Sequence, residues 1–412
     1  MLDKLFVLSW KFIENYNREY IRYFKKEHSL NNRFSIILGP RGVGKTTVII
    51  QHLLDYVKHK KYSKKAIYIQ ADHFLIGNSS LYEITEDFIN EGGELICFDE
   101  IHKYPEWSRD LKSIYDTFPK LKIIASGSSA LEIYKGSHDL SRRAIVYKMA
   151  VMSFREFLEL SIGKIELESY TMEQLINNHN HISDLIINKI EKTTNKILPL
   201  FKKYLKFGCY PYFIEYNDMD YFFITLEQNV HTIIESDLSS IYPRLNGLGL
   251  KKIKKLISFI SNAVPFTPDL KKIKKILEIG DERTLKMYLK YLEDGGLIRT
   301  VSKKGKSLSA LEKPEKIFLH NTNLSYAIGS MDGIQIGSIR ESFFITALSL
   351  KNDISVSDQG DFLVNDNYIF EIGGKKKTFN QIKDLKNSFL AVDDIEKGFG
   401  NKIPLWLFGF SY

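Results

Sequence analysis

The sequence has little cysteine and no long apolar run. Its two cysteines, Cys97 and Cys209, lie far apart without metal-ligand spacing, which argues against a disulfide framework or a zinc cluster and favours a reducing compartment. No apolar stretch approaches the roughly 20 residues that a membrane-spanning helix needs. The N-terminus carries an acidic residue, Asp3, and lacks the apolar core of a secretory signal. We therefore expect a soluble, cytoplasmic protein without a membrane partner.

The positive charge of the chain is concentrated in one region. The 412 residues carry a net charge of +8, and their number predicts two to four domains. Residues 251–316 contain 17 Lys/Arg against 8 Asp/Glu, so this region alone accounts for the basic excess. Such localisation indicates a polyanionic partner, whereas a solvated lysine-rich surface would explain the same count.

A glycine-rich loop at residues 39–46 lies between an apolar run, Phe34–Leu38, and a helical pattern that starts near Val48. A site for nucleotide phosphates needs this order of strand, loop and helix, because main-chain N–H groups of the loop surround the β-phosphate and the helix N-terminus adds partial positive charge. Lys45 is expected to reach the β- and γ-phosphate oxygens, and the Thr46 hydroxyl to hold Mg²⁺. The alternative is a chance turn between a strand and a helix. The predicted nucleotide-binding residues are Gly39, Arg41, Gly42, Val43, Gly44, Lys45, Thr46 and Thr47.

Two carboxylates end a later apolar strand, in the sequence Leu95–Phe98 followed by Asp99 and Glu100. A carboxylate at the end of a strand beside the phosphate loop can hold Mg²⁺ through water, which is the role expected of Asp99. The next residue, Glu100, is placed to polarise the attacking water as a general base. Many strands end in carboxylates, so this pair indicates a nucleotide site only because the phosphate loop precedes it in the sequence.

A serine and two arginines complete the expected site. Ser128, with Ser126 as the second choice, follows the next strand and could sense the γ-phosphate or the attacking water; capping a helix is the other role open to Ser128. Arg142 and Arg143 precede the last strand of the core. Either could act as an arginine finger, and either could instead pair with surface carboxylates.

Three segments carry a family resemblance: LICFDEIHKYPEWSRDLKSIYD (95–116), IIASGSSALEI (123–133) and LSRRAIVYKMAVMSFREFLEL (140–160). They resemble the AAA+ ATPase domain of a prokaryotic family sometimes called archaeal-type ATPases, in which a C-terminal region of undefined function follows. The resemblance implies an α/β P-loop NTPase fold with a parallel sheet and a small helical lid. It also implies Walker roles for Lys45, Thr46, Asp99 and Glu100, a sensor role for Ser128, and assembly into homo-oligomers.

Residues 250–318 resemble a winged helix. Leu250–Leu256 recurs almost unchanged at Leu270–Ile276, and both copies place apolar residues on one helical face with lysines outside. Asp281 is expected to cap a third helix, 282–294, which would enter a DNA major groove. A protein-binding role is the alternative. The candidate DNA contacts are Arg283, Lys286 and Lys290 on that helix and Lys303 and Lys304 on the wing.

The last segment, 319–412, resembles a restriction-endonuclease-like fold. The candidate metal site consists of Glu341 on a helix and Asp361 and Glu371 on two paired strands, with Lys375 nearby. Gly373 occupies the place of the usual lysine, and Lys375 comes two residues late. A degenerate, structural or nucleic-acid-binding domain is therefore preferred over an intact nuclease.

The predicted domains are an N-terminal helix (1–32), a P-loop ATPase core (33–150), a helical lid and connector (151–249), a winged helix (250–318) and a restriction-endonuclease-like domain (319–412). The preferred hypothesis is an Mg²⁺-dependent ATPase that moves its winged helix. The alternatives are a nucleotide-gated DNA-binding switch with little turnover and an ATP-gated, metal-dependent nuclease.

Overall fold

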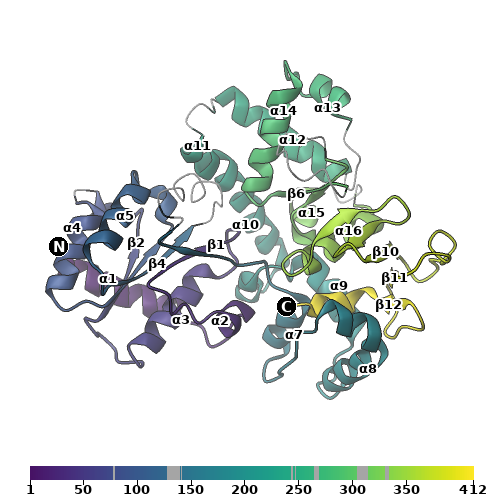
Figure 1. The fold of residues 1–412 in the computed structure, drawn as a ribbon, viewed down its shortest axis with the longest axis horizontal. Coiled ribbons are helices and arrows are strands. Elements are labelled where there is room, and N and C mark those ends of the chain that lie inside the picture. Colours follow the sequence, from purple (N-terminus) through teal and green to yellow (C-terminus); the bar gives the residue numbers. More distant parts are fainter. Residues whose placement is uncertain are drawn as a thin grey trace. The chain divides into compact units, whose positions relative to one another are not determined.

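The computed structural model describes residues 1–77, 79–127, 140, 142–242, 245, 247–263, 269–303, 314–329 and 334–412. The chain forms two compact units (Figure 1). The first contains Met1–Ala150 and Ser239–Pro243, and the second contains Val151–Leu238 and Arg244–Tyr412. The segments predicted as lid, winged helix and endonuclease-like domain thus belong to the second unit, apart from Ser239–Pro243 of the predicted lid and connector. Among the described residues, no helix is long and apolar enough to cross a membrane.

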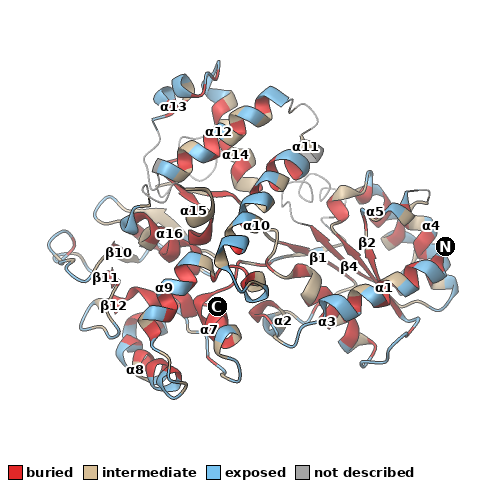
Figure 2. Ribbon diagram, turned by 180° about the vertical axis from the view of Figure 1, so that it is seen from behind, coloured by how far each residue is buried: buried red, intermediate tan, exposed pale blue. Residues whose placement is uncertain are grey.

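A five-stranded parallel sheet forms the centre of the first unit, as the sequence predicts. Its strand order is β2-β3-β4-β1-β5, so β4 lies between the strand that precedes the phosphate loop and the strand that ends in Asp99. All residues of β1 and β3 are buried, as expected for parallel strands covered on both faces (Figure 2). The strands are β1 (Phe34–Leu38), β2 (Ala66–Gln70), β3 (Leu95–Asp99), β4 (Lys122–Gly127) and β5 (Ile145–Lys148).

The N-terminal segment forms two helices instead of the single helix expected over most of residues 1–32. Helix α1 ends at Tyr16, and Asn17 is already extended. The side-chain amide of Gln51 donates hydrogen bonds to the carbonyl oxygens of Arg18 (2.7 Å) and Tyr20 (3.0 Å), which stabilises the extended segment. The helices of this unit are α1 (Leu2–Tyr16), α2 (Tyr23–Glu27), α3 (Lys45–Tyr56), α4 (Leu81–Asn90) and α5 (Trp107–Thr117), with 3-10 turns η1 (Phe74–Ile76) and η2 (Ile101–Lys103).

The first half of the second unit is helical. It contains α7 (Phe154–Ile162), α8 (Met172–Glu191), α9 (Ile197–Phe207), the 3-10 turn η3 (Pro211–Glu215), α10 (Met219–Thr232) and the π-helical turn η4 (Ile233–Asp237). A short helix, α11 (Leu238–Ile241), follows in the sequence, and its residues from Ser239 on belong to the first unit. Aromatic rings of Phe154, Phe157, Phe201 and Tyr204 pack together between α7 and α9.

Three helices and a hairpin follow in the order that the winged-helix prediction requires. They are α12 (Gly247–Ala263), α13 (Leu270–Ile276), α14 (Glu282–Asp294) and the antiparallel pair β6 (Ile298–Val301) and β7 (Lys316–Leu319). The predicted cap of α14 is confirmed, because Asp281 accepts a hydrogen bond from the Thr284 N–H at 2.8 Å.

The C-terminal part is a second, mixed five-stranded sheet with the order β12-β11-β10-β9-β8. Its interior is aromatic: Phe344 contacts Phe362, Phe370 and Phe408. Val356 donates its N–H to the Ser302 carbonyl at 3.0 Å, so the edge of this sheet is joined to the end of the hairpin. The elements are α15 (Thr322–Ile328), α16 (Ile336–Leu348), β8 (Ile354–Val356), β9 (Phe362–Val364), β10 (Tyr368–Gly373), β11 (Ser388–Val392), β12 (Lys402–Pro404) and the 3-10 turn η6 (Leu405–Phe410).

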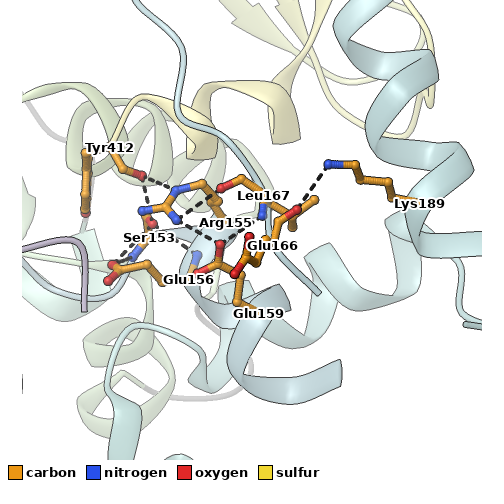
Figure 3. A network of polar contacts seen from close by, with 8 residues as sticks. All are labelled: Ser153, Arg155, Glu156, Glu159, Glu166, Leu167, Lys189 and Tyr412. Carbon is orange, nitrogen blue, oxygen red and sulfur yellow. Dashed lines mark hydrogen bonds and ion pairs between the residues drawn. The ribbon is translucent and has the colours of Figure 1, made fainter. Parts of the chain in front are cut away.

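A buried polar network joins Tyr412 to helix α7 (Figure 3). Arg155 donates from Nε to the Tyr412 carbonyl oxygen (3.0 Å) and from Nη1 to Glu159 (3.0 Å). Ser153 donates to the same carbonyl at 3.2 Å, and the Tyr412 hydroxyl donates to the Val151 carbonyl at 3.0 Å. The first and last segments of the second unit are therefore held together.

Candidate functional site

The phosphate loop has the backbone shape that its glycines permit. Gly42 (φ 81°) and Gly44 (φ 96°) adopt the left-handed region, which side chains disfavour. A Cβ atom at Gly39 would lie 2.3 Å from the Met149 carbonyl oxygen, so only glycine fits there. Gly44 precedes the first residue of α3, so the N–H groups of the first turn, which cannot pair within the helix, lie next to the loop. The loop can surround an anionic phosphate group.

The Lys45 side chain contacts the phosphate loop, where it is predicted to bind the β- and γ-phosphates. Its ammonium donates hydrogen bonds to the carbonyl oxygens of Gly39 (2.9 Å) and Pro40 (3.0 Å), and the residue is buried. Arg41 extends from the same loop, and its Nη1 is buried without a hydrogen-bond partner. Two cationic side chains thus stand at the position where phosphate charge is expected.

Asp99 accepts hydrogen bonds from three hydroxyl groups. Thr46 Oγ1 and Tyr68 OH each donate to Asp99 Oδ2 at 2.6 Å, and Ser126 donates to Oδ1. Burial, followed by the nearby Asp99 charge, raises the pKa of Tyr68 far above its usual value, so Tyr68 remains a donor. The predicted metal residues Thr46 and Asp99 are therefore adjacent, and both offer the oxygen ligands that Mg²⁺ prefers.

Glu100 is held in a strained and partly buried position. Its backbone is left-handed (φ 52°, ψ 39°), a conformation that costs a non-glycine residue of order 1–3 kcal/mol. Its N–H is directed to Ser126 Oγ at 3.3 Å, and its Oε2 is buried without a hydrogen bond, 3.5 Å from His102 Nε2. Burial raises the pKa of the Glu100 carboxyl, and the Lys45 ammonium opposes this shift. An orphaned carboxylate oxygen beside the phosphate loop fits a group that binds and polarises water.

The remaining residues predicted for this site fall in different places. Ser126, the second choice for the sensor, reaches Asp99, whereas Ser128 lies outside the described residues. Arg143 makes a two-pronged ion pair with Asp116, at 2.8 and 2.9 Å. Arg142 is exposed.

Three residues at this site were missed from the sequence. Tyr68 has a visible signal, because its hydroxyl interrupts an otherwise apolar strand whose end adjoins Asp99. His102 follows the carboxylates closely and could have been considered with them. Arg22 donates from Nη1 to the Val43 carbonyl of the phosphate loop, and no sequence signal indicated that contact.

Comparisons with known proteins agree with this geometry. Residues 31–158 match the family model described as AAA domain. This segment is similar to AAA domains. Residues 198–334 match a domain of unknown function, DUF8612, and no curated protein matches the chain. The AAA match covers the phosphate loop, Asp99 and Glu100, and it supports a nucleotide-binding ATPase domain in the first unit.

Solved structures give weaker likenesses. The Walker-type ATPase PABY2304 of Pyrococcus abyssi is 14% identical over 76% of this chain and 97% of its own, with a TM-score of 0.42. AMPPCP-bound DnaA from Aquifex aeolicus is 15% identical over 68% of this chain and 91% of its own, with a TM-score of 0.27. At these TM-scores the likenesses carry no argument about the chain.

The candidate DNA contacts are partly engaged within the protein. Lys286 pairs with Glu282 at 3.2 Å and Lys290 with Asp294 at 2.8 Å, whereas Arg283 is exposed. Lys303 pairs with Asp358 of the C-terminal sheet. Lys304 lies outside the described residues.

The candidate nuclease residues come together, but with different lysines from the one predicted. Glu341, on α16, and Asp361, before β9, receive the Lys316 ammonium at 2.9 and 3.6 Å. Glu371, on β10, pairs with Lys377, while Lys375 is exposed. The role of Lys375 stays a prediction, and the lysine that contacts Glu371 is Lys377. The reason is Gly373: a Cβ there would lie 2.6 Å from the Lys377 side chain, so the glycine makes room for Lys377 to reach Glu371.

These carboxylates do not fit a divalent cation. Lys316 stands between Glu341 and Asp361, and Asp361 Oδ2 already accepts the Ile372 N–H at 2.8 Å. Within the described part of the chain, no group of three His, Cys, Asp or Glu residues could hold a metal ion. A lysine ammonium supplies the positive charge that a metal would supply in an active nuclease.

Proposed function

We propose that the protein is an Mg²⁺-dependent ATPase. The observation that carries the proposal is the arrangement of Thr46, Asp99 and Glu100 beside the glycine loop. Lys45 and the loop N–H groups bind the β- and γ-phosphates, and Thr46 and Asp99 hold Mg²⁺. When bound, the ion neutralises charge on the phosphates. Glu100 orients the attacking water and accepts its proton.

Two further roles belong to the same proposal. Arg142 is the better candidate for an arginine finger, because Arg143 is engaged with Asp116. A finger supplied to a neighbouring subunit would make the active form a homo-oligomer.

In the second unit, ATP turnover moves the winged helix formed by α12–α14 and the hairpin, whose basic surface binds DNA. The nuclease alternative is not favoured, because Lys316 occupies the carboxylate cluster.

Replacement of Glu100 tests the proposed chemistry. Glu100→Gln keeps the shape of the side chain but cannot accept a proton, so the rate of phosphate release should fall by about 10²–10⁴-fold while ATP binding is retained. Phosphate release and binding of a fluorescent ATP analogue measure the two properties separately. Glu94→Gln is a matched control, because Glu94 lies at the opposite end of β3 and pairs with Lys65 at 2.7 Å. Unchanged phosphate release in Glu100→Gln would remove the assignment of the general base. A wild type that binds ATP without turnover would favour the nucleotide-gated switch.

A further inference from the structure

Arg22 is a buried arginine that contacts both the phosphate loop and Ala150, the last residue of the Met1–Ala150 segment of the first unit. Only 3% of the residue is exposed. One guanidinium nitrogen, Nη1, donates to the Val43 carbonyl in the loop, and the other, Nη2, donates to the Ala150 carbonyl at 3.3 Å. The guanidinium is thus held from two sides.

The surroundings of Arg22 fix its position. The preceding segment is held to α3 by the Gln51 amide, which donates to the Arg18 and Tyr20 carbonyls. The next residue, Tyr23, is buried, and its hydroxyl accepts the Ala150 N–H at 2.8 Å. Arg22 therefore has little freedom to leave the Val43 carbonyl.

The contact with Val43 determines where the next N–H points. A peptide group is planar and trans, so its carbonyl and its N–H point in opposite directions. When Arg22 holds the Val43 carbonyl on one side, the Gly44 N–H is directed to the other. Gly44 belongs to the loop whose N–H groups are proposed to bind the β-phosphate.

We infer that Arg22 is a positioning residue for phosphate binding, which it supports by fixing the peptide between Val43 and Gly44. The inference rests on the proposed nucleotide site and adds a residue that does not touch the nucleotide. It concerns ligands with a β-phosphate, so ADP and ATP should depend on Arg22 more strongly than AMP.

The experiment measures the affinities of the full chain for ATP, ADP and AMP by competition with a fluorescent ADP analogue. In Arg22→Gln, ADP and ATP should bind about 10- to 100-fold more weakly, the factor expected when a hydrogen bond to a charged group is lost. AMP should change much less, so the preference for ADP over AMP should fall at least about tenfold. A role in overall stability alone would not change this ratio.

Arg33→Gln is the matched control. Arg33 also donates from its guanidinium to two main-chain carbonyls, those of Tyr115 and Phe118, but it precedes the opposite end of β1. Thermal unfolding of both variants without nucleotide reports the loss of stability, and only Arg22→Gln should change the ADP-to-AMP ratio.

Each outcome decides the inference. If Arg22→Gln does not fold, the ratio is read in Arg22→Lys, which keeps the charge but cannot span two carbonyls. An unchanged ratio in a folded variant would overturn the inference. Failure of both variants to fold, with Arg33→Gln folded, would also overturn it in favour of a purely structural role. A wild type that binds neither ADP nor ATP would instead refute the proposed nucleotide site.

Discussion

Glu100 shows at the scale of one residue how a functional side chain can oppose stability. Burial raises its pKa, so folding favours the protonated form over the charged form that a general base needs. For a carboxyl whose pKa is raised on folding, the stabilising contribution is present below its ordinary pKa and is lost as the pH rises through the raised value. At neutral pH the ionised Glu100 therefore destabilises the nucleotide-free domain.

The first prediction concerns this pH dependence. Glu100→Gln should raise the unfolding temperature at about pH 7, by about 2–4 °C if the charge costs about 1 kcal/mol. The difference should shrink at about pH 4, where wild-type Glu100 is also neutral. Thermal unfolding of the wild type and of Glu100→Gln without nucleotide, at both pH values, measures this difference in unfolding temperature. An identical difference at both pH values would show that ionisation of Glu100 is not the cause.

The sequence revealed the residues of the site whose roles follow from local motifs. Lys45, Thr46, Asp99 and Glu100 were located from a loop and a strand end alone. Arg22 could not be predicted by the same means, and the only sequence signal for Tyr68 was a hydroxyl in an apolar strand. Tyr68 reaches Asp99 only because β2 pairs with β3, and Arg22 reaches Val43 only because the chain before β1 passes beside the loop. Contacts of this kind depend on the path of the chain in space.

At the scale of the element, apolar runs located the strands that precede the phosphate loop and Asp99, but the sequence did not locate all helix ends. The expectation of one helix across most of residues 1–32 was wrong because a distant side chain, Gln51, satisfies carbonyls that a helix would have paired. Similarly, the position of the lysine at Glu371 depends on the space above Gly373, which no sequence spacing reveals.

The second prediction concerns Lys316, which joins β7 to α16. Burial raises the pKa of Glu341, and Lys316 opposes this shift, so removal of the lysine leaves Glu341 and Asp361 as neighbouring uncompensated acids. Lys316→Met should lower the free energy of unfolding by about 1–3 kcal/mol at neutral pH, less than for a fully buried pair because the side chains are partly exposed. The loss should diminish as the pH falls and Glu341, whose pKa is raised, becomes protonated.

Chemical denaturation measures this effect, with Lys375→Met as the control because Lys375 is exposed. Adding Glu341→Gln to Lys316→Met should restore part of the stability. We also expect Mn²⁺ to raise the unfolding temperature of the second unit in Lys316→Met and not in the wild type. Stabilisation of the second unit of the wild type by Mn²⁺ would show that the lysine does not exclude a cation.

The third prediction concerns helix α14. If its exposed face contacts DNA phosphates, the affinity of the wild type should fall steeply with salt, with a slope of about −0.9 per phosphate contact. Arg283→Ala should reduce the magnitude of this slope by about 0.9. Lys203→Ala, on the exposed face of α9, should not change it. A flat salt series for the wild type would favour a protein partner for the three helices.

At the scale of the whole molecule, contacts between distant parts of the sequence close the second unit. Arg155 and Tyr412 lie at opposite ends of its sequence, and their buried hydrogen bond was not foreseen (Figure 3). The same holds for the join between the hairpin and the C-terminal sheet through Ser302 and Val356. A chain predicted as a row of several domains therefore forms two compact units, and these should unfold in separate steps.

The last prediction tests this division by calorimetry. ADP with Mg²⁺ at about 100 times its dissociation constant should stabilise the first unit by about 2.7 kcal/mol and raise its transition by about 5–10 °C, without moving the other transition. Arg155→Met breaks the buried pair with Glu159, which should cost about 3 kcal/mol or more and lower only the second unit's transition, by about 6–12 °C. Lys189→Met is the control, because Lys189 reaches the Glu166 carbonyl at an exposed site. A single transition that moves in both experiments would show that the units unfold together, because a ligand bound to one of them would then stabilise both.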